Sequence, residues 1–266
     1  MARAWIGTSG YNYAHWEGVF YPEGLPARKW LSYYAQVFPT VELNVTFYRL
    51  PQKKTFETWA KTAPEGFAFV LKGSRFITHI KRLKDAEGSI QILFDQSSPL
   101  EEKIAAVLWQ LPPRFRVDLQ RLKAFLRALQ ESPLARRYRH AFEFRDRTWF
   151  CDDVYDILQN HNAAIVLADW PFQVLAHGMR VQDIDREAIE APLTANFVYL
   201  RRHGPGALFS SNYPERMIRS DAEAIRKWLT EGREVYCFYN NDVAGYAVKN
   251  ALRLRELVEQ GEHYPA

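Results

Sequence analysis

The sequence predicts a single (β/α)8 barrel domain over residues 1–266, in which eight parallel strands alternate with helices around a closed sheet. Three observations lead to this prediction. Eight strand-like runs recur along the chain, helical patterns lie between most of them, and the length is typical of one such barrel. A doubly wound open sheet is the alternative, but the chain contains no GxGxxG or GxxxxGKS/T phosphate-binding pattern.

The predicted strands are residues 4–9, 40–48, 67–73, 105–111, 140–145, 164–169, 196–203 and 234–241. The second run, VELNVTFY, alternates strictly, so that Glu42, Asn44 and Thr46 share the face opposite its apolar side chains. Because the surrounding chain alternates strand and helix, we expect this polar face to point into a closed barrel. A buried carboxylate or amide needs partners, which makes this face a candidate ligand site.

Helices are predicted between the strands from apolar residues at a spacing of three and four. Two clear examples are residues 119–129 and 222–229. Asp118 and Asp242 are plausible N-caps, and Gly232 is suited to end a helix. Residues 74–103 and 204–213 are long, irregular connections, and the link after Asp169 has no clear helical period. Long loops that follow barrel strands commonly carry function.

Composition narrows the class of protein. Apolar residues make up 47% of the chain, which is ample for a large core and excludes a disordered composition. The net charge of +4 arises from 35 basic and 31 acidic residues, so the surface is mixed rather than a basic tail. Cys151 and Cys237 have no zinc-site spacing and fit a reducing compartment. Without an apolar signal core or membrane span, we expect a cytoplasmic protein with no membrane partner.

Polar residues gather at the C-terminal ends of the predicted strands, where barrel enzymes keep their active sites. Glu42 and Glu143 are the candidate catalytic residues, as a general base or an acid and base pair. The candidate ligand-binding residues are Ser9, Tyr11, Asn44, Thr46, Lys72, Gln110, Arg145, Asp169, Arg201, His203 and Asn240. An internal salt-bridge network among these acids and bases is the structural alternative. No metal site is predicted, and the sequence indicates neither a cofactor nor an oligomeric state.

Seven motifs in order resemble those of the domain of unknown function 72 family, also called YecE-like. They are IGTSGYNYAHWEGVFYP, TVELNVTFYRLP, WQLPP, FEFRDRTW, LADWP, YLRRHG and FYNNDVAGYAVKNA, and they extend nearly from end to end. The resemblance implies a (β/α)8 barrel of unestablished activity. The family's likeness to endonuclease IV barrels suggests DNA binding, but this chain has seven His without tight zinc-ligand spacing. Tyr11 stands where the family commonly has Trp, and Arg202 where an aromatic residue is expected.

Three functions are compatible with these residues. The first is binding of, or catalysis on, a phosphorylated or other anionic small molecule or nucleotide, because Lys72, Arg145, Arg201 and His203 would converge at one face. A hydrolase or a lyase would fit this class. The second is glycoside hydrolysis by Glu42 and Glu143, which requires carboxyl groups about 5–9.5 Å apart across an open cleft. An arginine wedged between them would exclude it.

The third function is nucleic-acid binding without catalysis, through aromatic side chains interleaved with basic ones. The candidate residues are Tyr11, Tyr13, Trp16, Tyr48, Arg49, Arg75, His79, Lys81 and Arg82. Aromatic residues in such loops also commonly cover helix ends. A steep fall of binding with salt would distinguish this function from the other two.

Overall fold

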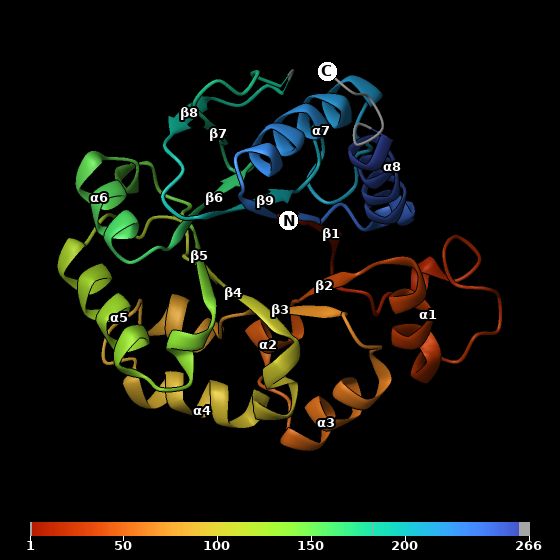
Figure 1. Ribbon diagram of the computed structural model, residues 1–266, viewed down its shortest axis with the longest axis horizontal. Helices are drawn as coiled ribbons and strands as arrows, with labels where there is room; N and C mark the ends of the chain where they lie inside the picture. The colour runs from red at the N-terminus through yellow and green to blue at the C-terminus, as the bar shows by residue number, and fades with distance from the viewer. Residues whose placement is uncertain (1, 183, 261–266) are drawn as a thin grey trace.

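A closed barrel of eight parallel strands forms the centre of the computed structural model, which describes residues 2–182 and 184–260 (Figure 1). The order around the barrel is β1-β10-β9-β6-β5-β4-β3-β2. The strands are β1 (Ala4–Ser9), β2 (Thr40–Leu43), β3 (Ala68–Lys72), β4 (Ile104–Gln110), β5 (Arg139–Glu143), β6 (Ala164–Ala168), β9 (Phe197–Arg202) and β10 (Glu234–Tyr239). The predicted (β/α)8 fold is confirmed.

Helices surround the barrel on its outer side (Figure 1). The longer ones are α1 (Trp30–Val37), α3 (Lys53–Thr62), α4 (Glu87–Ser97), α5 (Leu119–Glu131), α6 (Asp152–Asn160), α7 (Glu215–Thr230) and α8 (Tyr246–Gln260). Short turns of helix are η1 (Ala14–Trp16), η2 (Ala27–Lys29), α2 (Val45–Tyr48), the π-helix η3 (Phe76–Ile80), η4 (Ser98–Lys103), η5 (Ala135–Arg137), η6 (Arg147–Trp149) and η7 (Val243–Gly245). Asp118 caps α5 as predicted, accepting a hydrogen bond from the Arg121 amide.

The connection from β6 to β9 departs from the regular pattern. In its described residues it carries a two-stranded parallel sheet, β7 (Gln173–Ala176) and β8 (Ala188–Ala191), in place of a helix. The buried side-chain amide of Gln173 donates to the carbonyl groups of Gln182 and Ile184, both at 3.1 Å. These bonds tie the connection to β7. The lack of a helical period after Asp169 agrees with a connection that forms strands.

The prediction of one strand through residue 48 was wrong. Strand β2 ends at Leu43, and α2 follows directly. The Thr46 hydroxyl donates to the carbonyl oxygens of Leu43 and Lys72, at 2.8 and 2.7 Å, so it secures a helical turn against the end of β3. Thr46 is therefore fully buried against backbone instead of sharing an inward strand face with Glu42.

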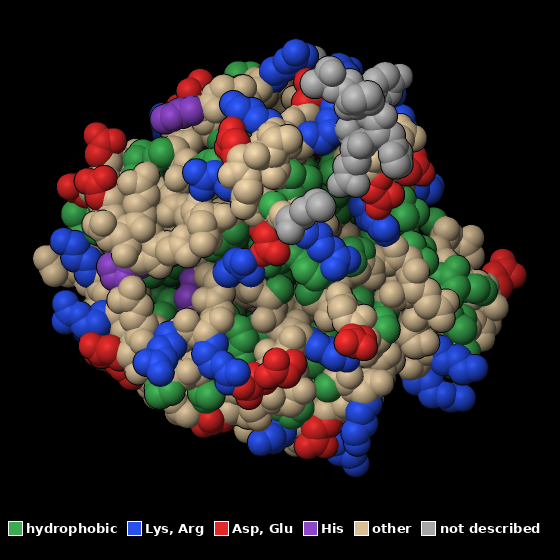
Figure 2. Space-filling view, viewed as in Figure 1, with side chains coloured by type: hydrophobic (Ala, Val, Ile, Leu, Met, Phe, Trp, Pro, Cys, Tyr) green, Lys and Arg blue, Asp and Glu red, His purple; other side chains and the backbone are tan. Residues whose placement is uncertain are grey.

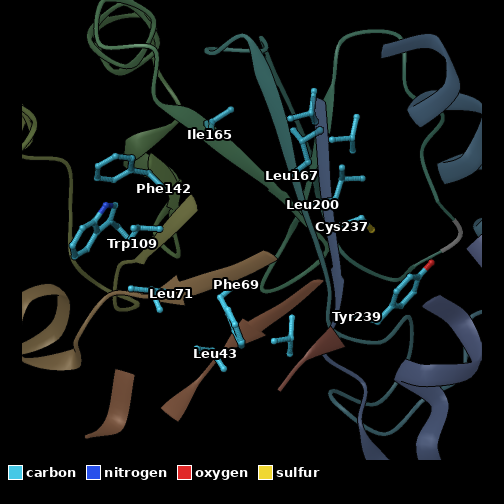
Figure 3. Packing of buried hydrophobic residues seen from close by; sticks show 14 of the residues in the cluster. Leu43, Phe69, Leu71, Trp109, Phe142, Ile165, Leu167, Leu200, Cys237 and Tyr239 are labelled. Carbon is cyan, nitrogen blue, oxygen red and sulfur yellow. The ribbon is translucent and has the colours of Figure 1, made fainter. Parts of the chain in front are cut away.

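The strand alternation separates two layers of core. Outward side chains such as Leu71, Trp109 and Leu167 pack beneath the helices, as Figure 3 shows. A smaller cluster that includes Val70, Leu108 and Tyr199 fills the barrel interior. Two residues farther along the same strands stand Lys72, Gln110 and Arg201. Because side chains alternate with period two, the register that fills the apolar interior also brings these polar groups to the mouth.

Gly7 marks a close approach of β1 to β2. A Cβ atom there would lie 2.3 Å from the Thr40 carbonyl oxygen, an overlap with backbone that no rotamer relieves. We expect Gly7→Ala to lower the free energy of unfolding by about 1–3 kcal/mol, as other overpacking substitutions do. Gly88→Ala is the matched control, because no atom of the described residues lies within 4 Å of the added Cβ. Urea denaturation measures both, and equal stabilities of the two variants would contradict the prediction.

Candidate functional site

A cavity of about 630 Å³ opens among the loops at the C-terminal ends of the strands. We call it the mouth cavity. Predicted site residues on its wall are Tyr11, Asn44, Lys72, Gln110, Arg145, Arg201 and Asn240, and the other lining residues are Gly10, Asn12, Tyr13, Leu43, Val45, Phe47, Tyr48, Trp59, His79, Trp170, Phe209 and Asp242. Five further predicted site residues lie behind this wall. They are buried, and they contact one another or the side chains of Arg145 and Arg201. These residues are Ser9, Glu42, Glu143, Asp169 and His203.

Arg201 joins the two candidate catalytic carboxylates. Its Nε and Nη2 donate to the two oxygens of Glu42 at 3.0 and 2.7 Å, while Nη1 donates to Glu143 Oε2 at 2.7 Å. All three side chains are at most 1% exposed. The Ser9 and Tyr199 hydroxyls each donate to Glu42 at 2.7 Å, which satisfies its remaining lone pairs. Such bidentate, charge-assisted bonds are the strongest class of side-chain hydrogen bond.

These contacts keep both carboxylates ionised. Burial acts to raise the pKa of Glu143, but the guanidinium groups of Arg145 and Arg201 outweigh it and lower the pKa to about 2. For Glu42, burial is likewise outweighed by Arg201, and its pKa lies below the ordinary value. Neither group is tuned toward neutrality as a general acid or base requires. Arg201 also occupies the space between them, which argues against the paired-carboxylate glycosidase.

His203 lies in the same network as a neutral acceptor. Its Nε2 is 3.0 Å from Arg201 Nη1 and 3.1 Å from Arg145 Nη2, and its Nδ1 is 3.2 Å from Asp169 Oδ1. Because a guanidinium only donates, we assign the ring proton to Nδ1, where Asp169 accepts it. Burial, followed by the two arginine charges, lowers the pKa of His203 well below its ordinary value. His203 therefore orients the arginines instead of binding an anion as a cation.

Arg145 has hydrogen-bonding capacity to spare. Its Nη2 binds Glu143 and His203, and the guanidinium stacks 4.1 Å above the Trp170 ring. Its Nε and Nη1 are buried, yet neither has a hydrogen-bond partner among the described residues. A buried donor left unpaired costs about 1–3 kcal/mol. These donors lie on a residue of the cavity wall, where an acceptor from a ligand could satisfy them.

Lys72 stands at the end of β3 and is 7% exposed. Its ammonium lies 4.4 Å from the centre of the Phe47 ring, and no carboxylate in the described part of the chain forms an ion pair with it. Burial, and next the charge of Arg201, lower the pKa of Lys72 to about 7, although Glu42 and Glu143 act in the opposite direction. Lys72 thus differs from Arg201, whose charge is fully compensated by two carboxylates.

Several features of the cavity were not predicted. Trp59 reaches it from α3, Phe209 from the irregular 204–213 segment, and Phe47 from the misassigned strand. Only the irregular segment gave a signal, as a long loop after a strand. Asp242, expected to cap the last helix, makes no side-chain cap bond in η7, so that prediction was wrong. Its carbonyl oxygen instead accepts from the Trp16 indole at 2.8 Å, and the residue lines the cavity.

Arg202 is buried on the opposite side of β9 from Arg201. It forms a bidentate pair with Asp221 of α7, with Nε and Nη2 at 2.7 and 2.6 Å from the two carboxylate oxygens. Arg202 therefore links the strand to a helix and takes no part in lining the cavity. Across residues 2–182 and 184–260, no group of three or more His, Cys, Asp or Glu side chains could hold a metal ion.

A family model described as "Protein of unknown function DUF72" matches residues 5–265. The chain belongs to this family. The resemblance found in the sequence motifs is thereby confirmed. The UPF0759 protein YunF of Bacillus subtilis (strain 168) is 26% identical, and the match covers 90% of each chain.

Solved DUF72 structures show the same barrel. A DUF72 family protein from Thermotoga maritima MSB8 superposes with a TM-score of 0.80 at 28% identity, over 97% of this chain and 99% of that one. Another DUF72 family protein, from Enterococcus faecalis V583, superposes with a TM-score of 0.74 at 21% identity, over 97% of this chain and 96% of that one. SacUVDE, at a TM-score of 0.53 and 8% identity over 98% of this chain and 99% of that one, shares the fold alone.

Removing the charge of Arg201 leaves two buried carboxylates without their common partner. We expect Arg201→Met to lower the free energy of unfolding by about 3–5 kcal/mol, as when a buried ion pair loses one member. Arg127→Met, at an exposed position of α5, is the control and should change stability by less than about 0.5 kcal/mol. Urea denaturation followed by circular dichroism measures both. A loss below 1 kcal/mol for Arg201→Met would refute the central role of this arginine.

Lys72→Met should change the free energy of unfolding in the opposite direction and stabilise the protein. The pKa of Lys72 is about 7 in the folded protein against an ordinary value of 10.5, so between these pH values the unfolded chain holds a proton that the folded protein releases. Stability of the native protein therefore rises with pH over this interval. At pH 7 we expect Lys72→Met to stabilise the protein by about 1–4 kcal/mol, with the gain shrinking toward pH 10.5. A gain independent of pH, or a loss, would contradict this assignment.

Proposed function

We propose that the mouth cavity binds a small phosphorylated or otherwise anionic molecule, with nucleotides included in this class. The observation that carries the proposal is Arg145, a residue of the cavity wall whose buried Nε and Nη1 have no hydrogen-bond partner among the described residues, together with Lys72 on the same wall. Arginine suits phosphate and carboxylate groups because its donors form a planar fork, and lysine adds a point charge.

Charge balance supports an anionic ligand. Among the side chains of the central network, Glu42 and Glu143 compensate Arg201, and Glu143 is shared with Arg145. Lys72, when protonated, adds a positive charge that no ion pair within the described residues neutralises. A third carboxylate, Asp169, contacts His203 and forms no ion pair with Arg145 or Lys72 in the described ranges. An anionic group of the ligand would give Arg145 and Lys72 a charged partner of their own, and charge-assisted hydrogen bonds of this kind are strong.

Aromatic side chains suit the uncharged part of the ligand. Tyr11, Tyr48, Trp59, Trp170 and Phe209 line the same cavity. Ligand cavities of about 300–1,000 Å³ are typical of drug-sized or cofactor-sized molecules, and this one lies within that range. Rings such as those of a sugar or a base could stack on these side chains.

Nucleic-acid binding stays the weaker alternative. On the face shown in Figure 2, Lys and Arg side chains are interspersed with Asp and Glu, and the printed sequence is close to balanced in charge. A nucleic-acid surface would be expected to gather positive charge along one path.

None of the helices in the described ranges has the length and apolar character of a membrane span. The two cysteines are free, which supports a cytoplasmic location as part of the proposal.

Thermal unfolding with paired ligands tests the proposed function. We expect inorganic phosphate, ribose 5-phosphate and AMP to raise the melting temperature of the native protein, while ribose and adenosine do not. Arg145→Met should abolish these shifts, because it removes the unpartnered donors. Arg127→Met, on the outer helix α5, should retain them. Equal shifts for charged and neutral partners, or unchanged shifts in Arg145→Met, would overturn the proposal.

A further inference from the structure

Lys72 has a setting that simple anion binding does not require. We propose that Lys72 is a catalytic nucleophile, which forms an imine with a carbonyl compound that also carries an anionic group. The anionic half of this substrate class rests on the proposed function. The nucleophile itself rests on the position and surroundings of Lys72.

The position of Lys72 suits a covalent role. It is the last residue of β3, and its backbone carbonyl accepts the Thr46 hydroxyl at 2.7 Å, so the base of the side chain is fixed by two neighbouring elements. The amine lies over the Phe47 ring, 4.4 Å from its centre, and Lys72 is one of the residues that line the mouth cavity. Sites built on rigid strand ends hold a reacting group more accurately than sites on loops.

Burial and the neighbouring charged groups determine whether the amine is free to react, and burial, the largest effect, favours its neutral form. Glu42 on β2 and Glu143 on β5 favour its charged form, whereas Arg201 on β9 and Arg145 after β5 oppose it. Both carboxylates are already bound by the arginines, and no ion pair in the described residues holds the Lys72 ammonium. With its pKa near 7, a large share of the amine is neutral at that pH, as a lysine nucleophile requires.

His79, in the π-helix η3 that follows β3, is a further titratable group near Lys72. Its Nδ1 lies 2.9 Å from the Thr78 hydroxyl, and its ring packs against Phe47 at 5.0 Å. Burial, followed by the charge of Lys72, lowers the pKa of His79 to about 4. At neutral pH it is therefore uncharged, and it adds no positive charge against formation of a cationic imine.

The proposed step is balanced without an oxidant or reductant. The neutral Lys72 amine adds through its lone pair to the carbonyl carbon as the C=O π bond breaks, and one N–H proton is transferred through solvent to the former carbonyl oxygen, which gives a carbinolamine. One further proton, taken up from solvent, converts the hydroxyl into a leaving water molecule. The nitrogen lone pair then forms the C=N bond as the C–O bond breaks, so that a protonated imine and one water molecule result from the amine, the carbonyl compound and one proton. Its positive charge withdraws electrons from the neighbouring carbon, which would labilise a C–H or C–C bond there, as in a lyase.

Reductive trapping tests the proposal. The native protein is incubated with dihydroxyacetone phosphate or with neutral dihydroxyacetone, cyanoborohydride is added, and the site is found by peptide mass spectrometry. We expect one adduct at Lys72, formed at least about tenfold faster than at exposed Lys53 and Lys54. Lys72→Met should show no such adduct and Lys53→Met should keep it. Thermal melting of each variant verifies that it is folded.

The two ligands separate this proposal from the preceding one. If phosphate, ribose 5-phosphate and AMP stabilise the protein but neither ketone labels Lys72 faster than Lys53, the imine is wrong and anion binding stands. If both ketones label Lys72 at equal rates, and Arg145→Met leaves the ratio of the two rates unchanged, the nucleophile stands and the anionic site is wrong. When both proposals hold, Arg145→Met lowers the ratio of the labelling rate with dihydroxyacetone phosphate to that with dihydroxyacetone about tenfold or more. The ratio is compared because removal of the Arg145 charge also changes the protonation of Lys72, which affects both ketones alike.

Discussion

The bridge from Arg201 to Glu42 and Glu143 is the interaction on which the rest of the site depends. Three charged side chains, each at most 1% exposed, are tolerable inside a barrel only because nearly every hydrogen-bonding atom among them has a partner. The bridge fixes both carboxylates in their charged state and joins β2, β5 and β9 across the mouth. It also brings Glu143 to Arg145, so that one carboxylate orients two guanidinium groups.

Because the bridge occupies both carboxylates, the three basic side chains of the site differ in how far their charges are paired. Arg201 has two carboxylate partners, Arg145 shares one of them, and Lys72 forms no ion pair within the described part of the chain. Arg201 is therefore a structural group, whereas Arg145 has donor atoms without a partner among the described residues. Lys72 is an amine that loses its proton near pH 7. Burying Lys72 in this way lowers stability, and a destabilising arrangement held by rigid neighbours is characteristic of functional sites.

The barrel was predictable because its signals are local and repeated, whereas the site depends on long-range register. Alternation in VELNVTFY indicated a strand throughout, but Thr46 finds an acceptor at Lys72, 26 residues away, and the chain turns into α2. Likewise, sequence placed Glu42 and Glu143 at the mouth but could not show that Arg201, on a strand far along the chain, reaches both. Polar residues could be assigned to the site, but which of them pair could not.

The order of the strands around the barrel places groups of different charge on opposite sides of the cavity. Lys72 and Gln110 end the adjacent strands β3 and β4, and Arg145 follows the next strand, β5. Asn240 and Asp242 follow β10, which lies across the barrel from β4. The cationic wall therefore faces an amide and a carboxyl group. Asp242 would repel a second anionic group at that side, because like charges in a partly buried site are unfavourable. For the proposed ligand, this arrangement favours one anionic end near β3 to β5 and hydroxyl groups at the other end.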